Sequence, residues 1–299
     1  MVELCGIPAS ALPALHESYE AAGTLKPELA ELWGLNDRVA VAAGAGDNAA
    51  SAIGTGTVHD GDVNISLGTS GTVFIARDGF CVDKHNALHS FCHADGKYHL
   101  LGCILSAAAC NGWWMGVLNS SDYDGEQAGA QNLLGKNSVY FLPYLNGERS
   151  PHNDVYARGA FVGLTPAASR THMTLAVLEG VAFALRDCIE VAGLSGGTAA
   201  SATRVCGGGA KSELWCNVLA NVLNMRVEKL AVDEGAAYGA AMLAMVAGGE
   251  YKDVREAADA LVRVKTVFTP SPDIAEAYRQ KYSAFRALYP ALKDVYRIL

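Results

Sequence analysis

Apolar and polar residues alternate with a period of two in several short stretches of the chain. This spacing predicts strands at 62–67 and 72–76, and the tight turn Gly68-Thr69-Ser70-Gly71 between them predicts a hairpin. Strand-like runs also occupy 38–43, 88–92, 98–105, 139–144, 203–206 and 227–232.

Helical spacing of apolar residues separates these strands. It predicts helices over 48–56, 106–118, 171 to about 192, 235–247, 273 to about 299, and one beginning near Ser212. The helix from 171 has its apolar face at Leu178, Val181, Ala182, Leu185 and Ile189. The helix at 235–247 consists of very small residues, so another element must pack closely against it.

The order of these elements predicts the fold class. Residues 1–35 are expected to form short helical pieces and turns, because Pro8, Pro13 and Pro27 interrupt them. A hairpin followed by strand–glycine–helix units predicts an α/β fold with a mixed sheet rather than a purely parallel one.

Composition and charge narrow the function classes. The 299 residues suffice for one large domain or two ordinary ones, and the formal net charge is −8 with no block of like charges. A surface that binds nucleic acid or anionic membranes is therefore not expected, although one basic pocket could still bind phosphates. The uncharged span 98–121 contains His99, Asn111 and Asn119, so we expect a buried strand and helix and no membrane span.

The eight cysteines are scattered without a CxxC pair. In a chain of this length they are expected to be buried, reduced thiols of a cytosolic protein. The N-terminus has no basic region followed by an apolar one, so we expect no secretion signal and a cytoplasmic location.

Three glycine-containing turns follow predicted strands: 44–46, 68–71 and 207–209. Each can present backbone N–H groups to a phosphate, and the first and third also open a helix, whose positive end favours an anion. One such turn is weak support, but three in one chain favour a nucleotide as ligand.

Two common nucleotide fingerprints fit poorly. Residues 44–49 satisfy G-x-G-x-x-A, with Asp62 near the distance of a ribose-binding acid. A hairpin follows, however, where a dinucleotide fold needs a parallel crossover, and Asp47 would repel a pyrophosphate. Residues 207–212 end in Lys-Ser as a P-loop does, but Ala210 stands where its glycine is required. A nicotinamide-dependent oxidoreductase is kept as a weaker alternative.

Other candidate groups have ordinary structural explanations. His85, His89, Cys92 and His93 lie close in sequence, but no second ligand pair at zinc-finger spacing accompanies them. Structural or substrate-adjacent roles are favoured over zinc, and no metal ligand is predicted. Trp113 and Trp114 are expected in the core and in a pocket wall rather than in a stacking platform.

Asp47 is the one acid in the stretch AAGAGDNAASAIGTG, residues 42–56. Two interpretations are open on local grounds. The carboxylate could cap the helix that follows, or it could serve chemistry, since a lone carboxylate among apolar residues is costly to desolvate.

Six ordered motifs resemble those of the FGGY family of carbohydrate kinases, which belongs to the actin/hexokinase/Hsp70-like ATPases. They are residues 42–56, SLGTSGTVFIA (66–76), residues 89–110, FLPYLNGERSPHND (141–154), VLEGVAFAL (177–185) and VCGGGAKSELW (205–215). The third and fourth of these, residues 89–110 and 141–154, are most similar to family members that phosphorylate ketopentoses. The resemblance implies a ribonuclease H-like α/β ATPase domain with a mixed sheet and flanking helices. The implied activity is ATP-dependent phosphorylation of a ketopentose, such as D-xylulose to D-xylulose 5-phosphate.

The resemblance also implies roles for residues. Asp47 would be the general base for the sugar hydroxyl, with Asn48 touching the sugar. Gly68, Thr69 and Ser70 would hold the β- and γ-phosphates of ATP. Gly208, Gly209 and Ala210 would lie along the α-phosphate and adenosine, and Glu213 would face the base or ribose. Ala108 and Gly112 match a family glycine and amide, and Mg²⁺ would bridge the phosphates.

The first phosphate motif of this family, a Gly-x-Asp-x-Gly-Thr hairpin, is absent from the chain. We therefore expect residues 1–57 to be the last strand and helix of the N-terminal FGGY domain and 58–299 to be the nucleotide-binding C-terminal domain. Two alternatives remain: a non-catalytic nucleotide-binding domain, or a kinase of another pentulose or hexulose. Expected partners are the sugar and ATP, with a homodimer or the missing N-terminal domain as further partners.

Overall fold

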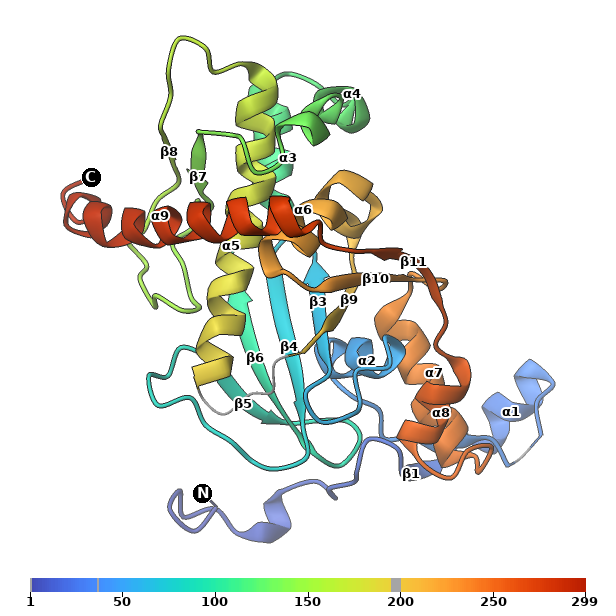
Figure 1. Ribbon diagram of the computed structural model, residues 1–299. Coiled ribbons are helices and arrows are strands. Elements are labelled where there is room, and N and C mark those ends of the chain that lie inside the picture. The colour runs from blue at the N-terminus through green and yellow to red at the C-terminus, as the bar shows by residue number, and fades with distance from the viewer. Residues whose placement is uncertain (1, 37, 195–199) are drawn as a thin grey trace.

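The computed structural model describes residues 2–36, 38–194 and 200–299. Its centre is a seven-stranded sheet with the order β11-β10-β9-β3-β4-β6-β5 (Figure 1). The strands are β3 (Val63–Leu67), β4 (Gly71–Arg77), β5 (His89–Cys92), β6 (Tyr98–Ile104), β9 (Ala202–Cys206), β10 (Arg226–Leu230) and β11 (Val264–Phe268). β3, β9 and β10 are parallel and the other neighbours are antiparallel, so the predicted mixed sheet is confirmed.

The β3–β4 hairpin follows the period-two pattern. Val73 and Ile75 of β4 belong to the main core, while Phe74 and Ala76 point to the other face of the sheet and pack with Ala52. Both faces are therefore apolar, and helices cover both.

Two helices lie on the first face, α5 (Arg170–Leu194) and α6 (Glu213–Leu223), and two more pack against them, α3 (Ala108–Val117) and α9 (Pro272–Tyr296). α5 lies over β4 and β6 (Figure 1). Ile189 of its predicted apolar face is partly buried against the core, and the other four residues of that face are fully buried: Leu178, Val181, Ala182 and Leu185. α9 continues past Pro290 to Tyr296. Val295 falls on the apolar spacing of the helix predicted from 273, but its side chain is 42% exposed near the end of the helix, so it is not a core residue.

The opposite face carries α2 (Asp47–Gly54), α7 (Gly235–Ala247) and α8 (Val254–Leu261). The helix of small residues, α7, packs on α2 as its composition predicts. A Cβ on Gly54 would lie 1.9 Å from the carbonyl oxygen of Gly235, so the two backbones are in direct contact.

The remaining elements are small. β1 (Ala21–Thr24) pairs with β2 (Ala40–Ala42), and β7 (Tyr140–Leu142) pairs with β8 (Ala160–Val162). Short helices are η1 (Ala9–Ala11), α1 (Pro27–Trp33), α4 (Tyr123–Gln127), η2 (Ala130–Leu133) and η3 (Gly208–Lys211). The sequence patterns did not predict β1, β8, β11, α4 or α8.

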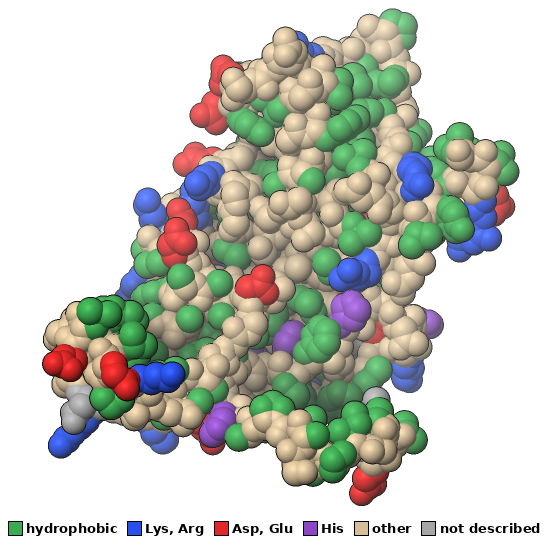
Figure 2. All heavy atoms as spheres, turned by 180° about the vertical axis from the view of Figure 1, so that it is seen from behind, with side chains coloured by type: hydrophobic (Ala, Val, Ile, Leu, Met, Phe, Trp, Pro, Cys, Tyr) green, Lys and Arg blue, Asp and Glu red, His purple; other side chains and the backbone are tan. Residues whose placement is uncertain are grey.

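All eight cysteines are free thiols. The prediction that they are buried is wrong for Cys5 and Cys92, which are exposed, whereas Cys110, Cys188 and Cys216 are buried. In the described residues, no helix is long and apolar enough to cross a membrane, and 98–121 forms the expected strand and helix. On the face drawn in Figure 2, acidic and basic side chains of the described residues are scattered rather than gathered in a basic patch.

Candidate functional site

Two of the three glycine turns meet at one edge of the sheet. β3 and β9 are parallel neighbours, so the turns that follow them, at Gly68 and Gly207, lie at the same edge. Gly207 has φ +89°, and a Cβ there would stand 2.9 Å from the carbonyl carbon of Leu67 and 3.2 Å from the nitrogen of Gly68. Only glycine allows this approach of the two backbones.

The orientation of α2 brings the first glycine turn toward the same edge. The Arg204 side chain donates to the carbonyl of Thr55 at 3.0 Å, and one turn earlier the Ser51 hydroxyl lies 3.6 Å from the Cys206 sulfur. α2 therefore runs antiparallel to β9. Asp47 lies one further turn along, about 6 Å beyond Ser51, in the direction of Gly207.

Asp47 is exposed and is the first residue of α2. The interpretation that its side chain caps the helix is wrong, because Gly46 is the N-cap and makes no side-chain hydrogen bond. The expectation of an apolar surrounding is also wrong for this carboxylate. Its Oδ1 accepts the backbone N–H of Asn48 at 2.8 Å and the Asn48 amide at 3.3 Å. These bonds fix Oδ1, and among the described residues none is recorded to Oδ2 of this exposed carboxylate.

The turn between β3 and β4 rests on the start of α3. The backbone N–H of Ala108 donates to the Gly68 carbonyl at 2.8 Å, and those of Ala107 and Ala109 donate to the Thr69 carbonyl at 2.9 and 3.2 Å. Within the described chain, no protein acceptor takes the N–H groups of Gly68, Thr69 or Ser70. Unpaired N–H groups in such a turn are a binding site for an anion.

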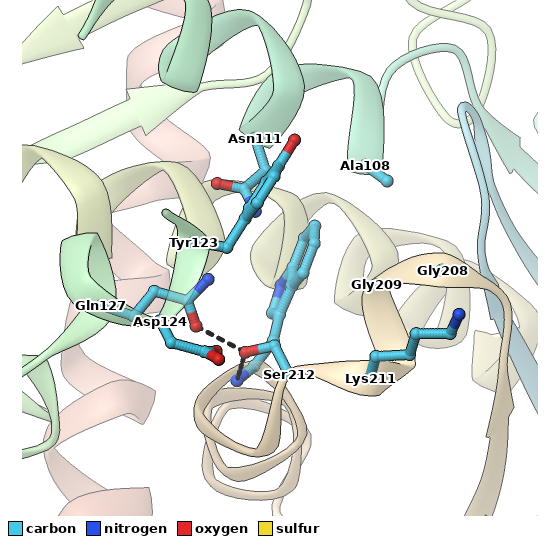
Figure 3. Close-up of a pocket in the computed structure, with 10 residues that line it drawn as sticks. Ala108, Asn111, Tyr123, Asp124, Gln127, Gly208, Gly209, Lys211 and Ser212 are labelled. Atoms are coloured by element: carbon cyan, nitrogen blue, oxygen red, sulfur yellow. Dashed lines mark hydrogen bonds between the residues drawn. The ribbon is translucent and has the colours of Figure 1, made fainter. Parts of the chain in front are cut away.

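A cavity of about 480 Å³ opens beside these turns, between α3, α4 and the start of α6 (Figure 3). Its lining consists of Ala108, Asn111, Tyr123, Asp124, Gln127, Gly208, Gly209, Lys211, Ser212 and Trp215. Gly208 and Gly209 therefore line a cavity, and their contact with a nucleotide stays a prediction. Ala210 is buried behind them and Glu213 is exposed at the start of α6, and neither belongs to this lining.

The polar groups of the cavity are held by their neighbours. The Ser212 hydroxyl caps α6 by accepting the N–H of Trp215 at 3.1 Å and donates to Gln127 Oε1 at 2.6 Å. Asn111 is buried, and within the described residues its Oδ1 has no hydrogen-bond partner.

Figure 3 shows how charge and aromatic groups are distributed around the cavity. Lys211 lies beside Gly208 and Gly209, whereas the Tyr123 ring lies beside Asn111. The Trp215 ring is a second aromatic group in the lining. A ligand with an anionic end and a flat end fits this arrangement.

The sequence patterns missed the contribution of α4 to this cavity. Tyr123, Asp124 and Gln127 lie on a five-residue helix with no apolar face. The one local signal is Asp122, whose side chain caps the helix by accepting the N–H of Gly125.

The other candidates lie elsewhere. His93 is buried and both ring nitrogens bond to the protein, Nε2 with the Thr57 carbonyl and Nδ1 with the Ala94 N–H. In the described residues, no group of three or more His, Cys, Asp or Glu is placed to hold a metal. Trp114 is a core residue as predicted, but neither it nor Trp113 lines the cavity.

The dinucleotide fingerprint does not form its fold. β2 pairs with β1 in a separate two-stranded sheet, and β3 is followed by an antiparallel partner. The parallel crossover that this fingerprint requires is therefore missing from residues 38–77.

Comparison with known protein families identifies both parts of the chain. Residues 63–248 match the C-terminal domain of the FGGY family of carbohydrate kinases, and residues 1–54 match the N-terminal domain of that family.

Individual relatives agree with this match. The chain is 39% identical to a xylulose kinase of Escherichia coli (strain K12), over 98% of this chain and 60% of the relative. It is similar to the crystal structure of a "xyloylose kinase" from Brucella ovis, with a TM-score of 0.91 and 38% identity, over 98% of this chain and 60% of the other. A xylulose kinase from Rhodospirillum rubrum gives a TM-score of 0.84 at 32% identity, over 99% and 60%. The chain thus spans about 60% of the length of the relatives it matches.

Proposed function

Because the chain belongs to the FGGY family of carbohydrate kinases, with the actin/hexokinase type of ATPase fold, we propose that it transfers a phosphoryl group from ATP to a ketopentose. The proposed substrate is D-xylulose and the product D-xylulose 5-phosphate, in line with the names of the relatives. One observation carries the proposal: the turns at Gly68 and Gly207 touch, and the helix that begins at Asp47 points toward them.

The nucleotide is proposed to span the two turns. The N–H groups of Gly68, Thr69 and Ser70 would bind the β- and γ-phosphates. Gly208 and Gly209 would lie along the α-phosphate, and the base would enter the cavity between α3 and α6. Ala210 supports this turn through its N–H, which donates to the Gly207 carbonyl at 3.1 Å, and Glu213 stays a proposed contact at the ribose side.

Asp47 is the proposed general base. A sugar hydroxyl needs a positioned carboxylate to accept its proton as it attacks the γ-phosphorus, and the leaving group is ADP. Asn48 would contact the same sugar, since its amide is exposed beside the carboxylate.

Magnesium is proposed as the metal of the ATP complex, where it neutralises phosphate charge. Mg²⁺ is held by phosphate oxygens, water and one or two carboxylates rather than by an all-protein cage. The described residues fit this, because no group of three or more His, Cys, Asp or Glu among them is placed to form such a cage.

The proposed organisation has residues 1–57 as part of the N-terminal FGGY domain and residues 58–299 as the C-terminal one. Most of the residues that contact the sugar would come from the additional length that the relatives have, or from a second copy of the chain. A cytoplasmic location, where ATP is available, is proposed on the eight free thiols.

Calorimetric titration of the 299-residue chain with ADP and a coupled assay with D-xylulose and ATP test this function. We expect ADP binding by the chain, and xylulose phosphorylation by a longer version with the additional N-terminal length of the relatives. In that version Asp47→Asn should abolish turnover and keep ADP binding. Retained turnover would remove Asp47 as the base, and thermal protection by NAD instead of ADP would contradict the kinase.

Nucleotide binding without turnover by the longer version would favour the alternative, a non-catalytic nucleotide-binding domain. Turnover of another pentulose or hexulose in place of xylulose would keep the kinase and change the substrate.

A further inference from the structure

The polar loop after β7, residues 146–153, has no part in the function proposed above, yet it contains a buried acid. Glu148 is 2% exposed. Its Oε1 accepts two backbone N–H groups, from Leu105 at 2.9 Å and from Arg149 at 2.7 Å. Within the described residues, Oε2 has no hydrogen-bond partner.

The same loop also bonds to the end of β6 and to the connection between β6 and α3. The Asn146 amide donates to the Ser106 hydroxyl at 3.2 Å. The N–H of Ser150 donates to the Cys103 carbonyl at 3.0 Å, and its hydroxyl accepts the N–H of Cys103 at 3.1 Å. Glu148 is fixed in turn, because its backbone N–H and carbonyl both bond to Asp154 at 2.9 Å.

The connection held in this way is the one that supports the turn at Gly68. Leu105, which donates to Glu148, is separated from Ala107 by a single residue. Ala107, Ala108 and Ala109 then donate to the carbonyls of Gly68 and Thr69. The backbone segment 105–109 therefore connects the Glu148 carboxyl group to the β3–β4 turn, through a hydrogen bond at Leu105 and three more at residues 107–109.

We infer that Glu148 is a positioning residue for the nucleotide: through residues 105–109 it fixes the carbonyls of Gly68 and Thr69, and so directs the N–H groups of that turn at the phosphates. The inference rests on the proposed function for the identity of the ligand. The positioning link itself can be measured without any ligand.

A purely structural role would leave the cost of the buried acid unexplained. A buried oxygen without a partner costs about 1–3 kcal/mol, and an apolar side chain of equal size would avoid that cost. An apolar side chain could not accept the Leu105 N–H, which points at Oε1. The contribution of Glu148 at this position is therefore its acceptor oxygen, Oε1.

The test compares Glu148→Gln, which keeps an acceptor oxygen, with Glu148→Met, which has similar volume and no such acceptor. Amide hydrogen exchange of the ligand-free 299-residue chain is followed in peptides covering 104–110 and, as a control, α6. We expect Glu148→Met to speed exchange in 104–110 by about tenfold with α6 unchanged, and Glu148→Gln to remain within about twofold of the parent chain. ADP titration should give a Kd about five to ten times higher for the Met variant only.

Unchanged exchange in 104–110, or equal acceleration in every slowly exchanging peptide, would overturn the inference, since the second result is loss of global stability alone. If the Met variant does not fold, Asn146→Ala, at an exposed side chain, must speed exchange of the same peptide, and no change there would also overturn it. A parent chain that binds no ADP, with the local exchange effect intact, would contradict the proposed function and leave the positioning link standing.

Discussion

Gly239 of α7 lies directly on Ala50 of α2: a Cβ at Gly239 would stand 1.8 Å from the Ala50 carbonyl oxygen. Gly54 makes the reciprocal contact, since its Cβ would stand 1.9 Å from the Gly235 carbonyl oxygen. These direct contacts between the backbones of α2 and α7 fix the place of α2 on the sheet. They thereby fix the position of Asp47 relative to the glycine turns.

Replacement of Gly239 by Ala must push the two helices apart. Overpacking of this kind costs about 1–3 kcal/mol, and two backbones leave no flexible side chain to yield, so we expect a loss at the upper end of that range. Urea unfolding followed by circular dichroism measures it. In the longer version, if it is active as proposed, the same change should lower turnover more than ADP binding, because α2 carries Asp47 and the cavity proposed for ADP lies elsewhere.

Gly116→Ala is the matched control. Gly116 lies within α3, is exposed, and has nothing within 4 Å of a Cβ. Ala in an open helical position should be neutral or stabilise by about 0.5–1 kcal/mol. A Gly239→Ala variant as stable as this control would mean that α2 and α7 are not in backbone contact.

The periodicity of apolar residues predicted the strands and helices that bury one face, or all of their surface, in the core. The hairpin at 62–76 and the helix from 171 were recognised because their apolar residues repeat at 2.0 and 3.6 residues. β11 could not be found this way, since Val264, Lys265 and Val267 are exposed and its pairing with β10 fixes it instead. α8 has a strong apolar face but only eight residues, which a window of helical length dilutes.

Ser212 connects the start of α6 to α4 through its bonds to Trp215 and Gln127. Ser212→Ala removes an N-cap, which costs about 1 kcal/mol, and frees Gln127 at the cavity wall. We therefore expect a modest fall in unfolding free energy together with several-fold weaker ADP binding, measured by urea titration and calorimetry.

Ser283→Ala controls for the loss of a serine hydroxyl, because Ser283 is exposed on α9 and bonds only to the carbonyl of Arg279 among the described residues. It should change stability by no more than about 0.5 kcal/mol and leave ADP binding as it was. If Ser212→Ala behaves like this control, the cavity between α4 and α6 is not the nucleotide site.

The thiols should react in the order of their exposure. Burial raises the pKa of Cys216 to about 11 and raises the pKa values of Cys110 and Cys188 further, so these three thiols have little thiolate and no access to reagent. Iodoacetamide should label Cys5 and Cys92 first, as mass spectrometry of peptides can follow. All eight should react in urea, and early labelling of Cys188 in the native chain would contradict the fold around α5.

The candidate site was only partly visible in the sequence. Glycine turns at 68–71 and 207–209 were found because the chain needs glycine where backbones touch, as at Gly207. Asn111 and Gln127 were missed, since buried amides in helices carry no periodic signal and gain their meaning from tertiary contacts. Glu148 was part of a recognised loop, but nothing local reveals that its side chain reaches Leu105.

The Glu148 carboxyl group should also make stability depend on pH. Burial raises its pKa to about 8 from an ordinary value of 4.5, with the Arg149 guanidinium opposing the shift and Asp187 adding to it. The thiols of Cys103, Cys110 and Cys188 also face this group. Between pH 4.5 and 8 the folded chain therefore holds a proton that the unfolded chain has lost.

The sign follows from this difference in bound protons. A folded-state pKa above the unfolded one gives stability that is complete below pH 4.5 and is lost as pH rises toward 8, by at most about 1.4 kcal/mol per pH unit. Other groups also make the stability of the parent chain depend on pH, because burial raises the pKa of Asp187 to about 6 and lowers that of His152 to about 4. Glu148→Gln retains both, so the difference between the two proteins isolates Glu148.

Urea unfolding at pH 5, 6, 7 and 8 measures this difference. The free energy of unfolding of the parent, relative to that of the Gln variant, should be highest at pH 5 and fall steadily toward pH 8. A difference that does not change with pH would mean that Glu148 titrates near its ordinary pKa, and that its carboxyl group is reached by water in solution.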